Sequence, residues 1–191
     1  MKPIENWENV KAVGSIENLP AGAYVCEIKQ AVEKPNKNSS GTHLEISFEV
    51  AEGEYKDFFG RDYRNQTRED KFWRGIIRQN IPNASSDKYA TQASFFRAFT
   101  DNVEASNPGY HWDWNEAGLK GKKIGVVFGE REKQSQKGNI YTVTDATDVI
   151  CVEDARAGRF KMPEKKTINP NANTFGSFAP IPAGSSDDLP F

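Results

Sequence analysis

The stretch 43–50, HLEISFEV, alternates between apolar and polar residues along its whole length. One side of this extended segment carries all of its aliphatic and aromatic residues, which are Leu44, Ile46, Phe48 and Val50. A two-residue period of this kind is typical of a half-buried β-strand. The stretch 23–34, AYVCEIKQAVEK, has a similar period, and the link 35–41, PNKNSSG, is rich in turn-forming residues. The sequence therefore predicts that these two strands form an antiparallel hairpin.

Three more strands are expected along the chain. Gly53 marks a turn, and the stretch 55–64 after it is expected to form a third strand. The stretches 121–130, GKKIGVVFGE, and 140–152, IYTVTDATDVICV, have the composition of strands, and a polar link joins them.

A helical middle lies between the third and fourth of these strands. Residues 68–80 are expected to form a helix from the spacing of Phe72, Ile76 and Ile77. Residues 92–105 are expected to form a second helix, because phenylalanines and Val103 recur there at three- and four-residue intervals. We therefore predict a mainly β protein, a five-stranded OB-fold-like barrel with a helical insert between strands 3 and 4. A generic β-barrel or an α+β sheet also fits this order.

The composition of the chain changes after Met162. Residues 163–191 contain five of the ten prolines, and no Lys or Arg follows Lys166. Such a segment buries too little apolar surface to offset the entropy of ordering it. The sequence predicts one domain over residues 1–161 and a flexible Pro/Asn/Gly/Ser tail over residues 162–191.

Charge and cysteine usage limit the classes of function. The formal net charge is -2, so binding to nucleic acid would need a local basic patch. No apolar run approaches the length of a membrane span, and the N-terminus lacks the apolar stretch of a signal peptide. Cys26 and Cys151 each lie in a strand-like run, which indicates buried, reduced thiols, with an inter-strand disulfide as the alternative. We expect a protein of the bacterial cytoplasm with no membrane association.

The chain ends in a compact acidic and apolar tip, which consists of Asp187, Asp188, Leu189, Pro190 and Phe191. A phenyl ring beside a terminal carboxylate offers one apolar anchor and one charge-assisted hydrogen bond, which suits a shallow basic pocket. This ending resembles the tip of bacterial single-stranded DNA-binding proteins, the SSB family, whose usual ending is three aspartates followed by Ile-Pro-Phe. Here Leu189 stands in the place of the isoleucine, and Ser186 stands in the place of the first aspartate.

The resemblance implies a function and a role for each tip residue. In the SSB family an OB domain coats single-stranded DNA, and a flexible linker carries the tip, which docks on replication and repair enzymes. By this resemblance Phe191 would fill an apolar pocket, its α-carboxylate would pair with an arginine, and Asp187 and Asp188 would meet a basic rim. Residues 107–130 also resemble a family of small proteins of Gram-positive phages encoded among replication and recombination genes.

Basic and aromatic residues interleave over residues 58–78. This stretch contains six basic and three acidic residues. Aromatic rings that stack on bases and cations that follow phosphates are the means by which proteins bind single strands. Phe72 fits an apolar stripe with Ile76 and is expected to pack in the core. The residues expected to contact nucleic acid in this stretch are Arg61, Tyr63, Arg64, Arg68, Lys71, Trp73 and Arg74.

Further lysines are expected near the same surface. Lys122 and Lys123 enter the predicted fourth strand, and the two hairpin loops that border the ligand groove of an OB-fold carry Lys37, Lys133 and Lys137. The acidic segment 109–116 contains Trp112 and Trp114, which we expect to cover an edge of the core.

No enzyme signature, metal site or cofactor motif is recognised, so we expect a non-catalytic binder without cofactor. Two histidines and two strand-embedded cysteines do not form a metal-ligand pattern. The predicted function is coating of single-stranded DNA, with recruitment of replication, recombination or repair proteins by the tip. The alternatives are a protein adaptor that mimics an SSB tip and an RNA-binding OB module. Either a monomer or a dimer is compatible with the sequence.

Overall fold

The computed structural model of the chain describes residues 3, 17–37, 41–135 and 137–168. The predicted acidic tip, from Asp187 to Phe191, lies outside the described residues, as does most of the predicted tail. Among the described helices, none is both long and apolar enough to cross a membrane.

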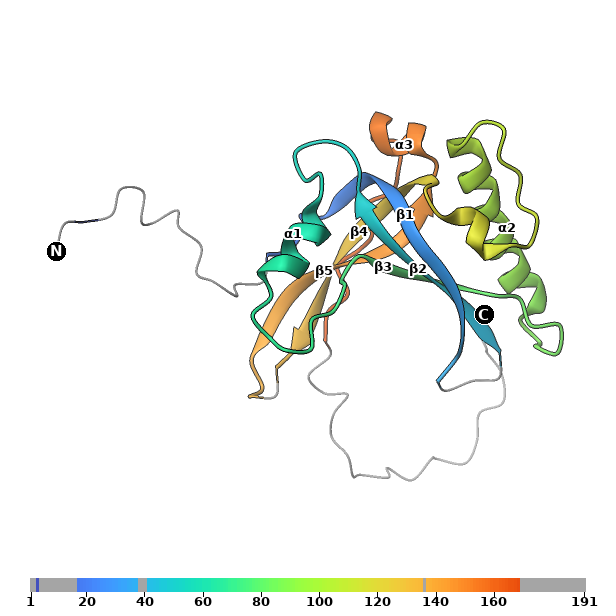
Figure 1. The fold of residues 1–191 in the computed structure, drawn as a ribbon. Helices are drawn as coiled ribbons and strands as arrows, with labels where there is room; N and C mark the ends of the chain where they lie inside the picture. Colours follow the sequence, from blue (N-terminus) through green and yellow to red (C-terminus); the bar gives the residue numbers. More distant parts are fainter. Residues whose placement is uncertain (1–2, 4–16, 38–40, 136, 169–191) are drawn as a thin grey trace, which may run out of the picture.

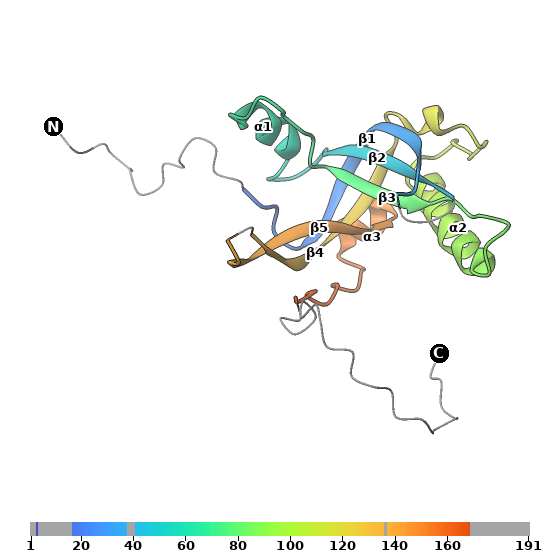
Figure 2. The ribbon, with the colours of Figure 1, turned by 90° about the horizontal axis from the view of Figure 1, so that it is seen from below.

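Five antiparallel strands form one sheet (Figure 1). The strands are β1 (Gly22–Pro35), β2 (Thr42–Val50), β3 (Ile76–Asn80), β4 (Lys123–Gln134) and β5 (Ile140–Ile150), and they lie in the order β3-β2-β1-β4-β5. The predicted hairpin is confirmed, since β1 pairs with β2 from Cys26 opposite Val50 to Pro35 opposite Thr42. The sheet is strongly curved but not closed into a barrel (Figure 2), and no ladder joins the edge strands β3 and β5 in the described part.

The predicted third strand and first helix are wrong. Residues of the expected strand form helix α1 (Phe58–Asn65), and the expected helix over 68–80 is instead an irregular segment followed by β3. The adjacent Phe58 and Phe59 are both buried, which a short helix lying across the end of β2 allows. Phe72, which was expected in the core, is 47% exposed, so the apolar stripe that suggested a helix does not exist.

The second predicted helix is confirmed as α2 (Tyr89–Ser106), which forms the helical insert between β3 and β4. Its inner face buries Phe96, Phe99, Thr100 and Val103. The segment after α2 packs along it, and Trp112 contacts the core as expected. Trp114 also covers an edge of the core, because its ring stacks on the buried Phe96, although 76% of Trp114 is exposed. A single 3-10 turn, η2 (Glu116–Leu119), leads into β4, and α3 (Val152–Ala157) follows β5.

The core lies between the inner face of the curved sheet and the helices. Its largest fully buried side chains include Phe48, Ile28, Ile46 and Ile124, and Phe128 packs against both Phe48 and Phe59. Both cysteines are free thiols. Burial raises the pKa of the Cys26 thiol, which keeps it protonated, and Cys151 caps α3 and donates a hydrogen bond to Asp154.

An ion-pair network fastens α3 to the sheet. Glu52, just after β2, accepts hydrogen bonds from Lys123 Nζ at 2.8 Å and from Arg156 Nη2 at 2.7 Å. These two cations lower the pKa of Glu52 to about 2. One carboxylate therefore joins the end of β2, the start of β4 and the small helix α3.

This network predicts a contribution to stability that depends on pH. Because the pKa of Glu52 is lower in the folded state than its ordinary value of 4.5, the contribution is complete above pH 4.5 and is lost as the pH falls towards 2. In Glu52→Gln the contribution is absent at every pH, so its thermal midpoint should fall less between pH 5 and pH 2 than that of the wild type. Thermal unfolding followed by circular dichroism measures this, with the exposed neighbour Glu54→Gln as control. Equal pH dependence in wild type and Glu52→Gln would contradict the role of the network.

Candidate nucleic-acid interface

A cleft of about 940 Å³ lies beside the open edge of the sheet. One wall is the chain from Phe72 to Arg78, which runs into β3, and the other is the first half of β5 from Tyr141 to Thr147. The buried rings of Phe58, Phe59 and Phe128 also line it, so the cleft reaches down to the core between β3 and β5. A third side is formed by Pro163, Glu164 and Lys166.

The cleft combines exposed rings with more basic than acidic side chains, although Arg74 and Arg78 pair with Asp62 and Glu45 outside its lining. Phe72 and Tyr141 are each 47% exposed and stand on opposite walls. The charged residues that line the cleft are five basic and three acidic, namely Arg74, Arg78, Arg131, Lys133, Lys166, Glu130, Asp145 and Glu164. Two of the cations face one acid, since Arg131 Nη2 lies 2.5 Å and Lys133 Nζ 3.6 Å from the Asp145 carboxylate.

The buried carboxylate of Glu49 positions α1 above this cleft. Only 5% of Glu49 is exposed, and its Oε1 accepts hydrogen bonds from the backbone N–H groups of Val50 at 2.8 Å and Phe59 at 3.0 Å. Its Oε2 accepts a third, from the N–H of Gly60 at 2.6 Å. The first N–H groups of a helix have no partner within the helix, and an anion there also interacts favourably with the helix dipole. Glu49 therefore fixes the start of α1 on β2.

The cleft wall from Phe72 to Arg78 is fixed by the backbone of Phe48, the neighbour of Glu49. The indole Nε1–H of Trp73 donates to the Phe48 carbonyl at 3.0 Å, and the Phe48 N–H donates to the Gly75 carbonyl at 2.8 Å. A Cβ atom at position 75 would overlap the Phe48 carbonyl and the Phe59 ring, so only glycine allows the chain to pass so close. Trp73 is thus half-buried, with its ring packed near Phe59 and Tyr63.

The side-chain amide of Gln66 closes the loop between α1 and the cleft wall that begins at Phe72. Gln66 Nε2 donates to the Phe72 carbonyl at 2.9 Å, and Gln66 Oε1 accepts from the Phe72 N–H at 3.1 Å. Below the loop Arg74 donates to Asp62 at 2.9 Å and to the Glu17 carbonyl. Arg74 therefore holds α1, the cleft wall and the segment before β1 together.

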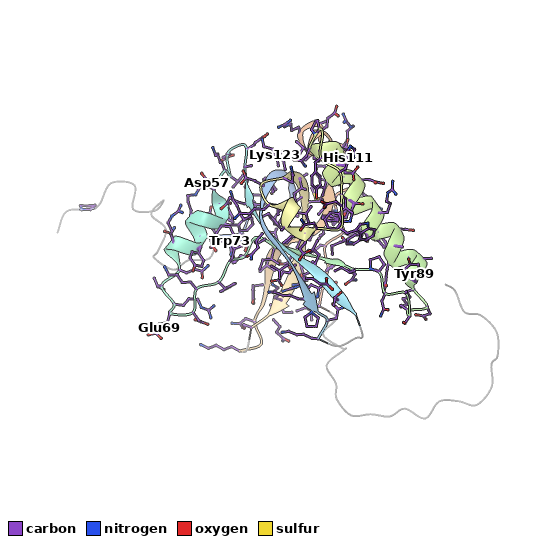
Figure 3. All side chains as sticks on the ribbon, turned by 45° about the vertical axis from the view of Figure 1, so that its right-hand side comes forward. Asp57, Glu69, Trp73, Tyr89, His111 and Lys123 are labelled. Atoms are coloured by element: carbon purple, nitrogen blue, oxygen red, sulfur yellow. The ribbon has the colours of Figure 1, made fainter. Side chains whose placement is uncertain are left out.

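The basic and aromatic residues exposed on α1 and its loop form what we call the basic rim, which consists of Arg61, Tyr63, Arg64, Arg68, Lys71 and Phe72. The acidic Glu69 and Asp70 are exposed on the same loop, and Asp70 pairs with Arg68 at 2.5 Å. The Arg68 guanidinium lies 4.9 Å from the centre of the Phe72 ring, and Lys71 Nζ lies 5.9 Å from that of Tyr63. Within the described part of the chain, the side chains of Arg61 and Arg64 have no carboxylate partner. Figure 3 shows the loop of the rim at Glu69, on the same side of the molecule as Trp73.

The structure brings together some of the residues predicted from sequence and separates others. Trp73, Arg74 and Lys133 line the cleft, and the basic rim adjoins it through Phe72. Lys37 and Lys137 are exposed near the ends of the two hairpins, outside the lining of the cleft. Lys122 and Lys123 lie elsewhere, since Lys122 Nζ sits 4.6 Å from the ring centre of Tyr110 and Lys123 pairs with Glu52.

Sequence reasoning missed three residues of the cleft. Tyr141 and Arg131 lie on the two strands of the β4–β5 hairpin, and only the curvature of the sheet turns them towards β3. Lys166 belongs to the expected tail, yet its backbone bonds to β4, with its N–H donating to the Glu130 carbonyl at 3.0 Å. The Pro163 ring packs against Gly129 at this point, and a Cβ atom at position 129 would lie only 2.9 Å from that ring.

The described residues contain no group of three or more His, Cys, Asp or Glu side chains that could hold a metal ion. No protein-family model and no curated protein sequence matches this chain. The interface must therefore be interpreted from its own geometry.

The account of Glu49 predicts a loss of stability in Glu49→Gln. Hydrogen bonds to a charged group contribute about 1.5–3 kcal/mol, and the amide would turn one donor towards the N–H groups of α1. We expect the free energy of unfolding to fall by about 2 kcal/mol in urea titrations, with faster hydrogen exchange at Phe59 and Gly60. The exposed Glu33→Gln on β1 is the matched control. An unchanged urea midpoint for Glu49→Gln would contradict the role given to this carboxylate.

Proposed function

We propose that this protein binds single-stranded DNA without strong sequence preference, in the cleft between β3 and β5 and along the basic rim. The observation that carries the proposal is the pairing of two exposed rings, Phe72 and Tyr141, on opposite walls of a cleft with a surplus of cations. Such rings offer stacking surfaces for unpaired bases, and the cations offer partners for the phosphates between them.

The order of the strands supports an OB-type fold for this domain. β1 pairs with both β2 and β4, β2 pairs with β3, and β4 pairs with β5. A five-stranded Greek-key barrel with its helix between the third and fourth strands has this order, opened here between β3 and β5. OB-folds bind oligonucleotides across the face of strands 2 and 3, between the loops of the two hairpins, and the cleft begins beside β3.

The contacts available in the cleft favour a single strand over a duplex. The Asp145 carboxylate shares Arg131 and Lys133, so phosphates must exchange with it for these cations. The rim cations Arg61 and Arg64 need no such exchange. Bases of a duplex are already stacked on each other and cannot enter between Phe72 and Tyr141, whereas those of a single strand can. We therefore assign the first contacts to the rim and the stacking to the cleft.

The second part of the proposal concerns partners. Asp187, Asp188, Leu189, Pro190 and Phe191 would bind replication, recombination or repair proteins, as the resemblance to the SSB tip implies. A protein tethered to DNA by its body holds such partners at high local concentration. The setting would be the cytoplasm of a bacterial host, as the resemblance to phage proteins implies.

Two alternatives remain distinct from this proposal. A protein adaptor with an SSB-like tip fits the net charge of -2, and it would show no salt-dependent binding to oligonucleotides. An RNA-binding module would use the same rings, because stacking does not distinguish ribose from deoxyribose. The cleft and its cations favour a nucleic acid over the adaptor.

Fluorescence anisotropy of a labelled dT oligonucleotide of about 15 nucleotides tests the proposal directly. We expect salt-sensitive binding, in which log K falls with log salt by about 0.7 for each phosphate contact. Tyr141→Ala should weaken binding roughly fivefold or more, because a stacked base contributes about 1–3 kcal/mol. The matched control is Tyr89→Ala on α2, since Tyr89 and Tyr141 are both 47% exposed.

Three outcomes would count against the proposal. No binding at micromolar protein in low salt would leave the adaptor. Equal losses in Tyr141→Ala and Tyr89→Ala would remove the cleft as the site. Tighter binding to rU than to dT of the same length would favour the RNA-binding module.

If the tip docks as the SSB tip does, the full chain should compete with a peptide of the SSB ending for the same enzyme. A fluorescent peptide that ends in Asp-Asp-Asp-Ile-Pro-Phe, bound to a replication or repair enzyme that recognises this ending, should be displaced by the full chain. Phe191→Ala removes the apolar anchor and should abolish displacement, whereas Phe72→Ala should displace the peptide as well as the wild type does. Displacement by Phe191→Ala at the wild-type concentration would contradict the role of the tip.

A further inference from the structure

Helix α2 and the loop after it each expose one large apolar side chain to solvent, Phe95 and Trp114. Trp114 is 76% and Phe95 is 67% exposed, more than any other large apolar side chain in the described residues. Trp114 stacks on Phe96 of α2 with ring centres 6.2 Å apart and an angle of 10° between the planes. The loop that carries Trp114 is held to α2 by Glu104, which accepts the Trp112 N–H at 2.8 Å. We call this surface the α2 face.

The backbone at Trp114 is held in an unfavourable conformation. Its φ is 65°, in the left-handed region that a bulky residue rarely adopts. Such a conformation costs on the order of 1 kcal/mol and persists only where surrounding contacts maintain it. The loop therefore holds the indole outward at a cost in folding stability. Exposed apolar side chains of this kind are typical of a surface that another molecule covers.

The charges around the α2 face favour a basic partner over a nucleic acid. The 18 residues of α2 contain only three charged side chains, of which Arg97 and Asp101 pair with each other at 2.7 Å. The acidic residues near the exposed rings along the chain are Glu104 on α2, Asp113 beside Trp114 and Glu116 at the start of η2. The Trp112 N–H and then His111 hold the pKa of Glu104 below its ordinary value, so it is charged at neutral pH. Phosphates would be repelled here.

The basic rim of the same chain has the complementary chemistry. It presents Arg61 and Arg64, which have no carboxylate partner among the described residues, and the exposed ring of Phe72 with the Arg68 guanidinium over it. Helices α1 and α2 lie at opposite ends of the molecule in both Figure 1 and Figure 2, and Glu69 of the rim loop is far across Figure 3 from His111. The two surfaces therefore cannot meet within one copy.

We propose that the α2 face of one copy docks on the basic rim of a second copy, so that the protein associates head to tail. The contact is heterologous, because two different surfaces meet, and it leaves a free face and a free rim at the ends of every assembly. It requires no DNA. A further consequence, which does rest on the proposed function, is that single-stranded DNA competes with the neighbouring copy for the rim.

Sedimentation velocity of the full chain at low and moderate salt tests the contact, with two double variants at exposed positions. The face variant is Phe95→Lys/Glu116→Lys, and the rim variant is Arg61→Glu/Arg64→Glu. The wild type should associate with rising concentration, and salt should weaken this association. Each variant alone should sediment as a monomer. Their equimolar mixture should form a pair of twice the monomer mass, because the intact face of the rim variant docks on the intact rim of the face variant.

Other outcomes would overturn the inference. A monomeric mixture, or a wild type that stays monomeric at low salt, would remove the contact. A rim variant that dimerises alone would show that two α2 faces pair symmetrically, and a face variant that associates alone would show that another segment, such as the acidic tip, occupies the rim. Circular dichroism melts confirm that both variants are folded.

Binding of the dT oligonucleotide separates this inference from the proposed function. At protein concentrations where the wild type is monomeric, the face variant should bind the oligonucleotide at least as tightly as the wild type, since its rim and cleft are unaltered. Addition of the oligonucleotide to the wild type should dissociate the assemblies. If the wild type associates but dT binds nowhere, the self-contact stands and the proposed function fails.

Discussion

The buried carboxylate of Glu49 is the interaction on which the candidate site depends. An anion removed from water is costly unless it is fully hydrogen-bonded, and Glu49 meets this condition with three backbone N–H groups. Two of these belong to α1, so the helix is bound to the end of β2 by the groups that its own start leaves unpaired. The adjacent Phe48 binds Trp73 and Gly75 through its backbone. Two consecutive residues of one strand therefore place the basic rim and a wall of the cleft.

The parts of the fold that could be predicted from the sequence are those with a local periodic pattern. The hairpin of β1 and β2 and the inward face of α2 follow from the two-residue and helical periods of their own residues. Helix α1 and strand β3 could not be predicted in this way. Phe58 and Phe59 are adjacent in sequence and both buried, which matches neither period, and the group that fixes the start of α1 is Glu49, ten residues before Phe59.

Part of the candidate site could likewise be predicted from local sequence, and part of it could not. Interleaved basic and aromatic residues indicated the rim, because these residues are neighbours along the chain. The opposite wall depends on topology, since the curvature of the sheet and the return of the chain along β4 bring Tyr141 and Lys166 to the cleft. Phe72 was assigned to the core from its spacing, and it is exposed because Gln66 holds its backbone in a loop. Lys122 and Lys123 were grouped with the site because they enter the predicted fourth strand, and they lie beside Tyr110 and Glu52.

A net charge of -2 hides a strong separation of charge within this protein. Arg61 and Arg64 on α1 have no carboxylate partner among the described residues, whereas Glu104, Asp113 and Glu116 lie on α2 and in the segment after it. Under the proposed function, an acidic protein would bind a polyanion through the local field at the rim. The separation of charge also gives the molecule two unlike ends, which is the condition for head-to-tail association.

The most direct test of the central claim is to map the contacts of single-stranded DNA residue by residue. Amide ¹H–¹⁵N spectra of the full chain, titrated with a short dT oligonucleotide, report which backbone groups change their surroundings. The account predicts that the shifts concentrate in the rim, in residues 72–78 and in residues 141–147, on the two walls of the cleft. Shifts confined to α2 and the loop of Trp114, or no shifts in the presence of saturating oligonucleotide, would contradict it.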